Sequence, residues 1–336
     1  HALSLNEIKT LAASGATDWA LSELDKAQPA PSKNPFTWEQ YERTRLDLYE
    51  REARWTQLIQ RVESQLAVMP SVFRAYAEAR EAMALLELGR YARAAAFIDE
   101  RLQALKNKPA SKDLADAQED AALVAQLQRL EIRALTAAGQ YAKAQQKLTA
   151  YKTQYAQPLD FRAQTGIPRL PQGYISVLSH EVTRLEARLS LHQGNARHAL
   201  QLLKTDDSEE AIWLSALATL INDPTQATTV YSQAINAAKN TRTLPQKRRS
   251  YALAAQAAQR SEHSINRILA LEAGLALART PRQNETSQAE ELLPLSTDQL
   301  WQAYQSFGVA RASQLRADLP PDATADNLTA QIQQEI

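Results

Sequence analysis

The chain of 336 residues contains no cysteine. This absence excludes disulfides, thiolate nucleophiles and thiolate metal ligands. Cysteine is often avoided in the bacterial envelope, where a free thiol is readily oxidised, so we expect a periplasmic location, with the cytoplasm as the alternative. The first residue is His1 rather than Met, which fits either a removed leader peptide or an expression remnant.

Glycine and aromatic residues are also scarce. Only 8 residues are glycine and 6% are aromatic, whereas β-strands favour aromatic and β-branched residues with turn-forming glycines between them. The sequence is instead rich in Ala, Leu, Gln, Glu and Arg, which form helices well. These features predict an all-α fold.

The chain lacks a net charge and lacks long apolar runs. Its 38 Lys and Arg balance 38 Asp and Glu, giving a formal net charge of +0. A dedicated nucleic-acid binder needs a basic excess, so we do not expect nucleic acid as the partner, although a local basic patch is compatible with neutrality. No stretch approaches the ~18 apolar residues of a membrane-spanning helix, so no span is predicted.

A short pattern recurs along the first two thirds of the chain. A glycine is followed after two residues by an aromatic residue, after three more by a small one, and after four more by a large apolar one. The clearest copies are Gly89, Tyr91, Ala94 and Ile98, then Gly139, Tyr141, Ala144 and Leu148. Weaker copies begin at Gly15, Ala53, Gly194 and Asn222. The glycine suits a tight turn between helices, and the small residue allows the two helices to approach closely.

This pattern resembles the tetratricopeptide repeat, a helix-turn-helix unit that stacks into arrays. The spacing between copies departs from the family period of about 34 residues, so the array is degenerate. The resemblance implies a right-handed α-α superhelix of stacked helix pairs over residues 1–237, with residues 238–336 forming further helices that continue or cap it. It also implies a concave surface, formed by the first helix of each pair, that binds a peptide or protein partner.

Capping signals predict where several helices begin. Ser4 with Glu7, Thr37 with Gln40, and Ser296 with Gln299 read as capping boxes, and Asp206 with Glu209 as an acidic variant. Beyond residue 238 we expect helices over 250–260, 265–280 and 297–307, then a last helix after Pro320-Pro321. The segment 158–173, with three prolines and two glycines, predicts an irregular stretch.

No pattern of residues predicts catalysis or metal binding. His192 and His198 are six residues apart across the Gly194 turn, which does not suit a zinc pair on one helix face. Ser179, His180 and Glu181 are adjacent letters rather than a triad assembled in space. Paired carboxylates are interpreted as solvated helix faces. We therefore expect no enzyme activity, no cofactor and no metal site.

Arginines recur at helical spacing on the polar faces of the expected first helices. Because Arg binds carboxylates in bidentate fashion, these side chains are candidates for a partner-binding groove. They are Arg43, Arg74, Arg80, Arg129, Arg133, Arg184 and Arg188.

Aromatic residues divide into two groups. Trp19, Trp55, Tyr91 and Tyr141 lie at or beside the repeat turns and are expected to pack there. For a second group the sequence leaves open whether the side chain packs or faces a ligand: Tyr41, Tyr49, Tyr76, Trp213 and Tyr231.

A second candidate surface is a basic stretch without acidic residues. It contains Lys239, Arg242, Lys247, Arg248 and Arg249, with Pro245 inside it. Such a stretch can hold an anionic glycan, a lipid head group or an acidic peptide, or it can be a solvated loop between helices.

Three functions follow from these features. The first is a non-catalytic scaffold or adaptor of the bacterial envelope that recruits a peptide or protein. The second is the superhelical regulatory part of a larger peptidoglycan-acting enzyme or enzyme activator, which a catalytic or ligand-binding domain in the parent gene would favour. The third is a binder of an anionic glycan or other polyanion, which would show steeply salt-dependent binding.

Overall fold

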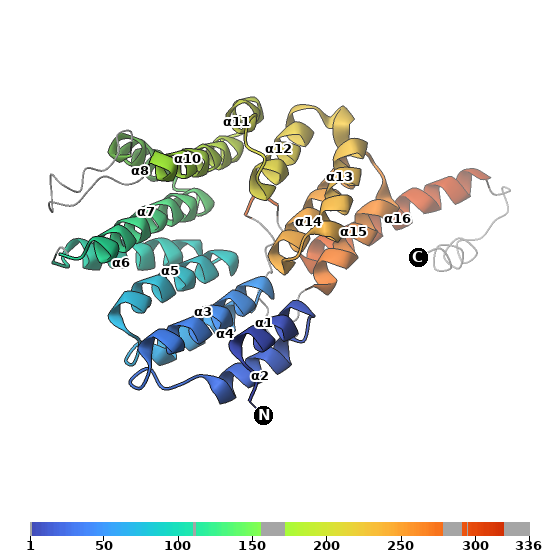
Figure 1. Ribbon diagram of the computed structural model, residues 1–336. Coiled ribbons are helices and arrows are strands. Elements are labelled where there is room, and N and C mark those ends of the chain that lie inside the picture. The colour runs from blue at the N-terminus through green and yellow to red at the C-terminus, as the bar shows by residue number, and fades with distance from the viewer. Residues whose placement is uncertain (1, 110–111, 156–171, 278–290, 294, 319–336) are drawn as a thin grey trace. The chain divides into compact units, whose positions relative to one another are not determined.

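The computed structural model describes residues 2–109, 112–155, 172–277, 291–293 and 295–318. Within these ranges the chain forms fifteen α-helices and one 3-10 helix and has no β-strand (Figure 1). The predicted all-α class is therefore confirmed for the described residues. The expected irregular stretch 158–173 and the helix after Pro320-Pro321 lie mostly or wholly outside these ranges.

The chain divides into two compact units. Unit 1 comprises residues 1–215 with 243–245, and unit 2 comprises residues 216–242 with 246–336. The division falls inside helix α12 (Glu209–Asn222), earlier in the chain than the boundary expected at residue 237.

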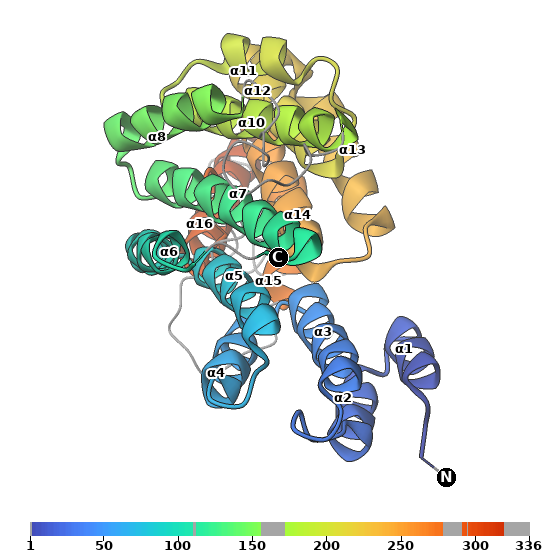
Figure 2. The ribbon, with the colours of Figure 1, turned by 60° about the vertical axis from the view of Figure 1, so that its left-hand side comes forward.

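Unit 1 consists of antiparallel helix pairs. The helices before α12 are α1 (Leu5–Ala13), α2 (Thr17–Ala27), α3 (Pro35–Arg51), α4 (Trp55–Gln65), α5 (Ser71–Glu87), α6 (Tyr91–Lys106), α7 (Leu114–Ala137), α8 (Tyr141–Gln154), α10 (Gln172–His192) and α11 (Ala196–Leu203). Within each pair the second helix contacts the first, and the first helix also contacts the first helix of the next pair. These neighbours are α1 with α3, α3 with α5, α5 with α7, and α7 with α10. Figure 2 shows α3, α5, α7 and α10 following one another in this order.

The turn inside each pair has the same backbone geometry. Gly15, Gly89, Gly139 and Gly194 adopt positive φ angles of 91°, 76°, 78° and 79°, which only glycine adopts at low cost. At Gly139 the amide bonds the carbonyl of Thr136, and the next amide, of Gln140, bonds the carbonyl of Leu135. This pair of bonds is a Schellman motif, and it satisfies carbonyls left open at the helix end. The predicted turns are confirmed.

Ala53 takes the glycine position in the α3–α4 turn. Its φ of 53° is left-handed, and its bonds repeat the Schellman pattern, with Ala53 N–H to Glu50 and Arg54 N–H to Tyr49. A residue with a Cβ adopts this conformation at a cost of roughly 1 kcal/mol. The second copy of the repeat therefore keeps the turn without its glycine.

The core positions of the pattern are buried in all five pairs. The position five residues after the turn is fully buried, and so is the position four residues further on. They are Ala20, Leu58, Ala94, Ala144 and Ala199, followed by Leu24, Val62, Ile98, Leu148 and Leu203. Of the turn aromatics, Trp55 is buried and Tyr91 and Tyr141 are half-buried, whereas Trp19 is 59% exposed, contrary to the expected packing role.

The described part of unit 2 also consists of helices. They are the 3-10 helix η1 (Pro224–Gln226), α13 (Ala227–Asn240), α14 (Leu244–Arg260), α15 (Ser264–Ala276) and α16 (Thr297–Asp318). Helix α14 begins before residue 250, with Pro245 in its first turn, where the missing amide costs nothing. Glu262 joins α14 to α15 with φ 58° and the same Schellman bonds, a repeat turn that the sequence pattern does not reveal.

Two of the predicted caps are confirmed and two are wrong. Ser4 with Glu7 and Ser296 with Gln299 form reciprocal capping bonds. Thr37 does not begin a helix, because α3 starts at Pro35 and Asn34 accepts from the Thr37 amide. Likewise the Ser208 hydroxyl, rather than Asp206, accepts from the Ala211 amide at the start of α12.

No helix in the described ranges combines the length and the apolar character needed to cross a bilayer.

Candidate ligand groove

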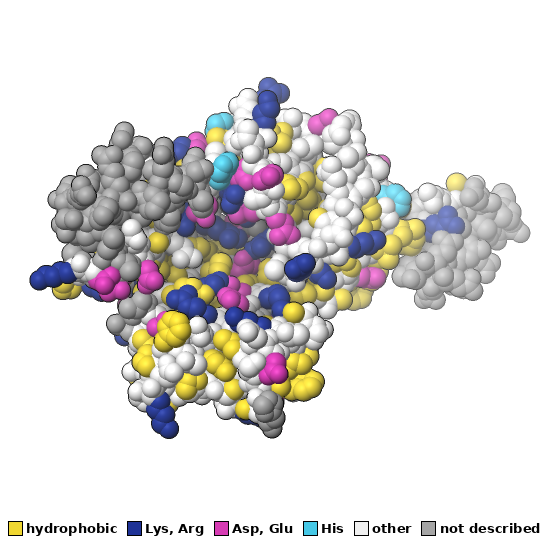
Figure 3. All heavy atoms as spheres, viewed as in Figure 1, with side chains coloured by type: hydrophobic (Ala, Val, Ile, Leu, Met, Phe, Trp, Pro, Cys, Tyr) yellow, Lys and Arg dark blue, Asp and Glu magenta, His cyan; other side chains and the backbone are white. Residues whose placement is uncertain are grey.

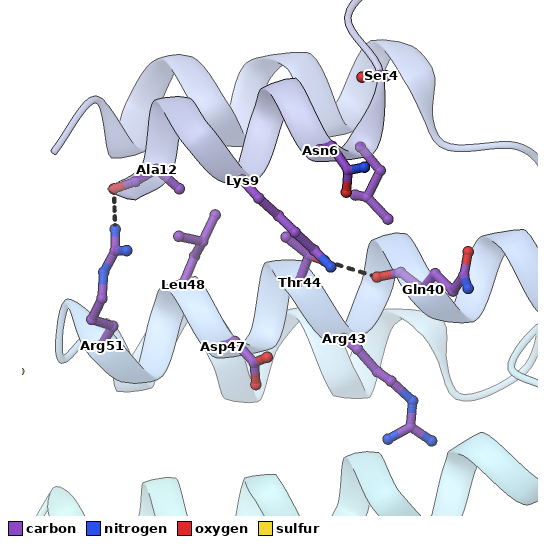
Figure 4. Close-up of a pocket in the computed structure, with 11 residues that line it drawn as sticks. Ser4, Asn6, Lys9, Ala12, Gln40, Arg43, Thr44, Asp47, Leu48 and Arg51 are labelled. Atoms are coloured by element: carbon purple, nitrogen blue, oxygen red, sulfur yellow. Dashed lines mark hydrogen bonds between the residues drawn. The ribbon is translucent and has the colours of Figure 1, made fainter. Parts of the chain in front are cut away.

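A groove of about 720 Å³ lies between α1 and α3 in unit 1 (Figure 4). Both are first helices of their pairs, so the groove lies on the side where first helices adjoin one another. It is lined by Ser4, Leu5, Asn6, Lys9, Ala12, Gln40, Arg43, Thr44, Asp47, Leu48 and Arg51.

The walls of the groove are fixed by packing and by one capping contact. Ile8 and Ala12 of α1 are buried in one cluster with Leu48 of α3. Arg51 donates to the Ala12 carbonyl at 2.7 Å, and it lies 3.5 Å from the Glu52 carboxylate. The Ala12 carbonyl also accepts from the Gly15 amide, so Arg51 adds a charged donor at the end of α1, where the helix dipole favours a cation. The apolar cluster and this bond both join α1 to α3.

Cations outnumber anions along the groove. Lys9, Arg43 and Arg51 line it against a single carboxylate, that of Asp47, which lies 3.0 Å from Arg80. Arg51 is already engaged, but within the described part of the chain neither Lys9 nor Arg43 forms an ion pair within 4 Å. Burial raises the pKa of Asp47 and both cations lower it by attraction from a longer distance, but neither contacts a carboxylate among the described residues.

Arg43 rests on an aromatic shelf formed by α5. Its guanidinium carbon lies 4.1 Å from the ring centroid of Tyr76 and 5.4 Å from that of Phe73. Phe73 is fully buried and packs edge-on against Trp38 at 5.3 Å, so the shelf is anchored in the core. A guanidinium stacked on a ring keeps its N–H donors free in its own plane. The shelf therefore orients Arg43 and leaves its N–H groups able to donate hydrogen bonds to another group.

Arg80 also contacts Tyr76. Its guanidinium lies 4.9 Å from the ring centroid, donates to the Tyr76 hydroxyl, and pairs with Glu50 and Asp47 of α3. Burial raises the pKa of Glu50, an effect that Arg80 opposes. Arg80 therefore joins α5 to α3 and is largely satisfied within the protein.

Four more of the predicted groove arginines also pair within unit 1. Arg129 lies 2.6 Å from Glu181, and Arg133 lies 3.9 Å from Glu87. Arg184 binds Asp206 through two bonds of 2.6 and 3.1 Å, and lowers the pKa of Asp206 to about 2. Arg188, which is buried, lies 2.9 Å from Glu210. These four side chains connect neighbouring helices.

Arg74 is the most exposed of the paired arginines. It forms an i,i+4 pair with Glu78 at 3.1 Å along α5, with 47% of its side chain exposed. The structure thus brings Arg43, Arg74 and Arg80 onto α3 and α5 and places the other four on α7 and α10. Figure 3 shows Lys and Arg side chains interleaved with Asp and Glu on the visible face.

The basic stretch lies where α13 ends and α14 begins in unit 2. Lys239 is in the last turn of α13, Arg242 lies in the connection, and the other three residues are in the first turns of α14. Lys239 and Arg242 are exposed, whereas Lys247, Arg248 and Arg249 are half-buried. The stretch is therefore separate from the groove.

Two features of the site were not foreseen from the sequence. Lys9 lines the same groove as Arg43 because α1 stacks on α3. The sequence does not predict which side chains this stacking brings to one groove. For Tyr76 the sequence left open whether the side chain packs or binds, and its ring is close to the guanidinium groups of Arg43 and Arg80. Trp213, from the same open group, is buried, and Tyr41, Tyr49 and Tyr231 are half-buried.

A buried polar network joins the first two helix pairs. Glu42 is fully buried and accepts from Arg61 at 2.7 and 2.8 Å and from Gln28 at 2.8 Å. Arg45 is also buried and donates to Asp25 at 2.6 Å. A charge at Glu42 is tolerated because several donors surround it.

Glu81 of α5 is a second buried acid, with 3% of its surface exposed. Burial, together with the hydrogen-bonded carboxyl group of Glu63 and the nearby charge of Glu78, raises the pKa of Glu81 to about 8, while Arg93 opposes this shift. In the described ranges no group of three His, Asp or Glu side chains is arranged to hold a metal ion. We therefore interpret Glu81 as a buried carboxyl group with a structural role, hydrogen-bonded to Glu63.

The histidines and Glu181 have structural contacts. The His192 ring packs on Tyr141 at 5.8 Å, and His198 lies 3.8 Å from Glu186. Glu181 pairs with Arg129. No protein-family model matches the chain, and no curated protein matches its sequence.

Proposed function

We propose that this chain is a non-catalytic helical-repeat scaffold that binds an extended acidic segment of a partner protein in the groove between α1 and α3. The proposed architecture is a right-handed superhelix of the tetratricopeptide-repeat kind. It is supported by the repeated Schellman turns and by the contacts between successive first helices. The bacterial envelope is the proposed location, on the ground that the chain has no cysteine.

The observation that carries the proposal is a pair of cations on one groove, Lys9 and Arg43, that form no ion pair within 4 Å with the described residues. Lys9 extends from α1 toward α3, and Arg43 extends from α3 on the side away from α1 (Figure 4). There the Arg43 guanidinium lies over the Tyr76 ring. Carboxylates of a peptide that crosses the groove would gain charge-assisted contacts with Lys9 and Arg43, while half-buried Leu5 offers apolar surface to its neighbouring residues. An extended segment suits an open groove better than a folded domain does.

Fluorescence anisotropy with a panel of labelled peptides tests this proposal. The panel contains extended peptides with Asp and Glu and matched peptides with Asn and Gln instead. We expect the acidic members to bind, and we expect the variant Lys9→Ala/Arg43→Ala to bind them at least about tenfold more weakly, because two charged contacts are lost.

The matched control is Lys33→Ala/Lys106→Ala, which removes two exposed cations of unit 1 outside the groove. This control should bind as the unmodified protein does. The proposal is wrong if amide peptides bind as tightly as acidic ones, or if both double variants bind alike. Unfolding midpoints of all three proteins show whether a loss of affinity is a loss of fold.

A further inference from the structure

The hairpin formed by α13 and α14 has an unusual charge distribution. Between Asp223 and Glu262 the chain contains six Lys or Arg residues and no Asp or Glu. The whole protein has a net charge of +0, so this segment concentrates positive charge that the rest of the chain balances. Five of the six cations gather where α13 meets α14, and Arg260 lies at the far end of α14.

The position of these cations is unfavourable for the isolated helix. Lys247, Arg248 and Arg249 lie in the first turns of α14, and its first turn has no acidic residue. The N-terminal end of a helix carries positive partial charge, so a cation near it is unfavourable and does not stabilise the helix. An anion at this surface would relieve that repulsion.

Three of the cations have capacity for such an anion. In the described part of unit 2, Lys239, Arg242 and Lys247 form no ion pair within 4 Å. Lys239 and Arg242 are exposed, and both lie within three residues of the connection between the helices. Arg248 and Arg249 follow directly in the chain and have partners of their own within the protein.

We propose that Lys239, Arg242, Lys247, Arg248 and Arg249 form a binding surface for an anionic glycan, a polysaccharide bearing carboxylate or sulfate groups. The described residues of α13 and α14 include no exposed large apolar side chain that could insert into a membrane or stack on a nucleic-acid base. A nucleic-acid duplex also favours a wider basic surface than this one hairpin of a neutral chain provides. A surface that offers positive charge but no exposed large apolar side chain suits a hydrated ligand such as an anionic glycan.

Binding of a fluorescent heparin dodecasaccharide and of oligogalacturonate tests the proposal with the full chain. The two probes separate sulfate from carboxylate recognition. At about 50 mM salt we expect binding of at least one probe, and we expect the variant Lys239→Glu/Arg242→Glu/Lys247→Glu to lose at least about tenfold in affinity. Raising the salt to about 200 mM should weaken binding by the unmodified protein more than binding by the variant.

The matched control reverses three exposed cations of unit 1, as Lys33→Glu/Lys106→Glu/Lys143→Glu, and so changes the net charge equally. Retained glycan binding by this control supports the surface. The proposal fails if neither glycan binds, if the control loses as much affinity as the patch variant, or if a DNA duplex or phosphatidylglycerol vesicles bind more tightly than both glycans. Circular dichroism of each variant verifies the helical fold.

Discussion

At the scale of single residues, the arginines of unit 1 fall into two groups. Arg80, Arg184 and Arg188 connect neighbouring helices and have carboxylate partners within the protein. Arg43 instead rests on Tyr76 and forms no ion pair with the described residues. Arginine spacing in a sequence identifies both kinds of residue alike. Only the structure separates a side chain that joins helices from one that forms no ion pair with the described residues.

Replacing Glu42 with Ala should destabilise unit 1 by about 3 kcal/mol, because it leaves buried Arg45 and its neighbour Arg61 without their shared carboxylate. The free energy of unfolding in urea measures the loss. Asp18→Ala is the control, since it removes an 85% exposed partner of Arg54 and should cost less than about 1 kcal/mol. Equal losses in the two variants would show that burial of the network adds nothing.

Glu81 should make stability depend on pH. Its pKa is raised from 4.5 to about 8 in the folded protein, so the folded state binds more protons than the unfolded state between these values. The contribution of Glu81 to the free energy of unfolding is therefore fully present below about pH 4.5 and is lost as pH rises through about 8. The slope is at most about 1.4 kcal/mol per pH unit.

The variant Glu81→Gln should remove this slope and be more stable than the unmodified protein at pH 8. Unfolding in urea from pH 5.5 to 8 provides the measurement, with exposed Glu100→Gln as a control for nonspecific charge effects. An unchanged pH slope in Glu81→Gln would mean that Glu81 is ionised throughout. Comparison between variants also cancels the titration of the five histidines.

At the scale of elements, the turns were the most predictable part of the fold. The sequence around Gly89 and Gly139 carries a glycine, an aromatic residue and a small residue in fixed order, and each serves a local need of one helix pair. Glu262 occupies the same left-handed position with no glycine, and the small position five residues later is Arg267. That turn was not predictable, because its conformation is imposed by the packing of α14 and α15 and not by local preference.

Substitutions at two of the turns should change the free energy of unfolding in opposite directions. Gly139→Ala should cost about 1 kcal/mol, since an added Cβ meets nothing within 4 Å and only the positive φ opposes it. Glu262→Gly should gain about 0.5 kcal/mol, because the relief of strain exceeds the entropy cost of glycine and the side chain is exposed.

The control for these variants is Gly308→Ala inside α16, where the Cβ also meets nothing and φ is not left-handed. It should stabilise the helix by about 0.5–1 kcal/mol. Thermal unfolding ranks the three variants. If Gly139→Ala stabilises as Gly308→Ala does, the left-handed turn is not a source of strain.

At the scale of the whole molecule, the sequence indicated helices, pairs and most buried positions but not the surfaces. The core positions Ala94, Leu148 and Leu203 follow from spacing within a single pair. The groove depends on which helices stack, and its cations Lys9 and Arg43 are far apart in the chain. The neutral total also conceals the basic hairpin of α13 and α14, because acidic residues elsewhere cancel its charge. The net charge of a protein does not describe how its charged residues are distributed over the surface.

The most direct test of the groove is a double-mutant cycle between Arg43 and a bound peptide. Affinities are measured for the unmodified protein and Arg43→Ala, each with the tightest acidic peptide and with its single Glu→Gln or Asp→Asn derivatives. A groove that binds carboxylate through Arg43 predicts a coupling energy of about 1–3 kcal/mol for one acidic position, and none for Lys33→Ala. Coupling below about 0.3 kcal/mol at every acidic position would contradict the account.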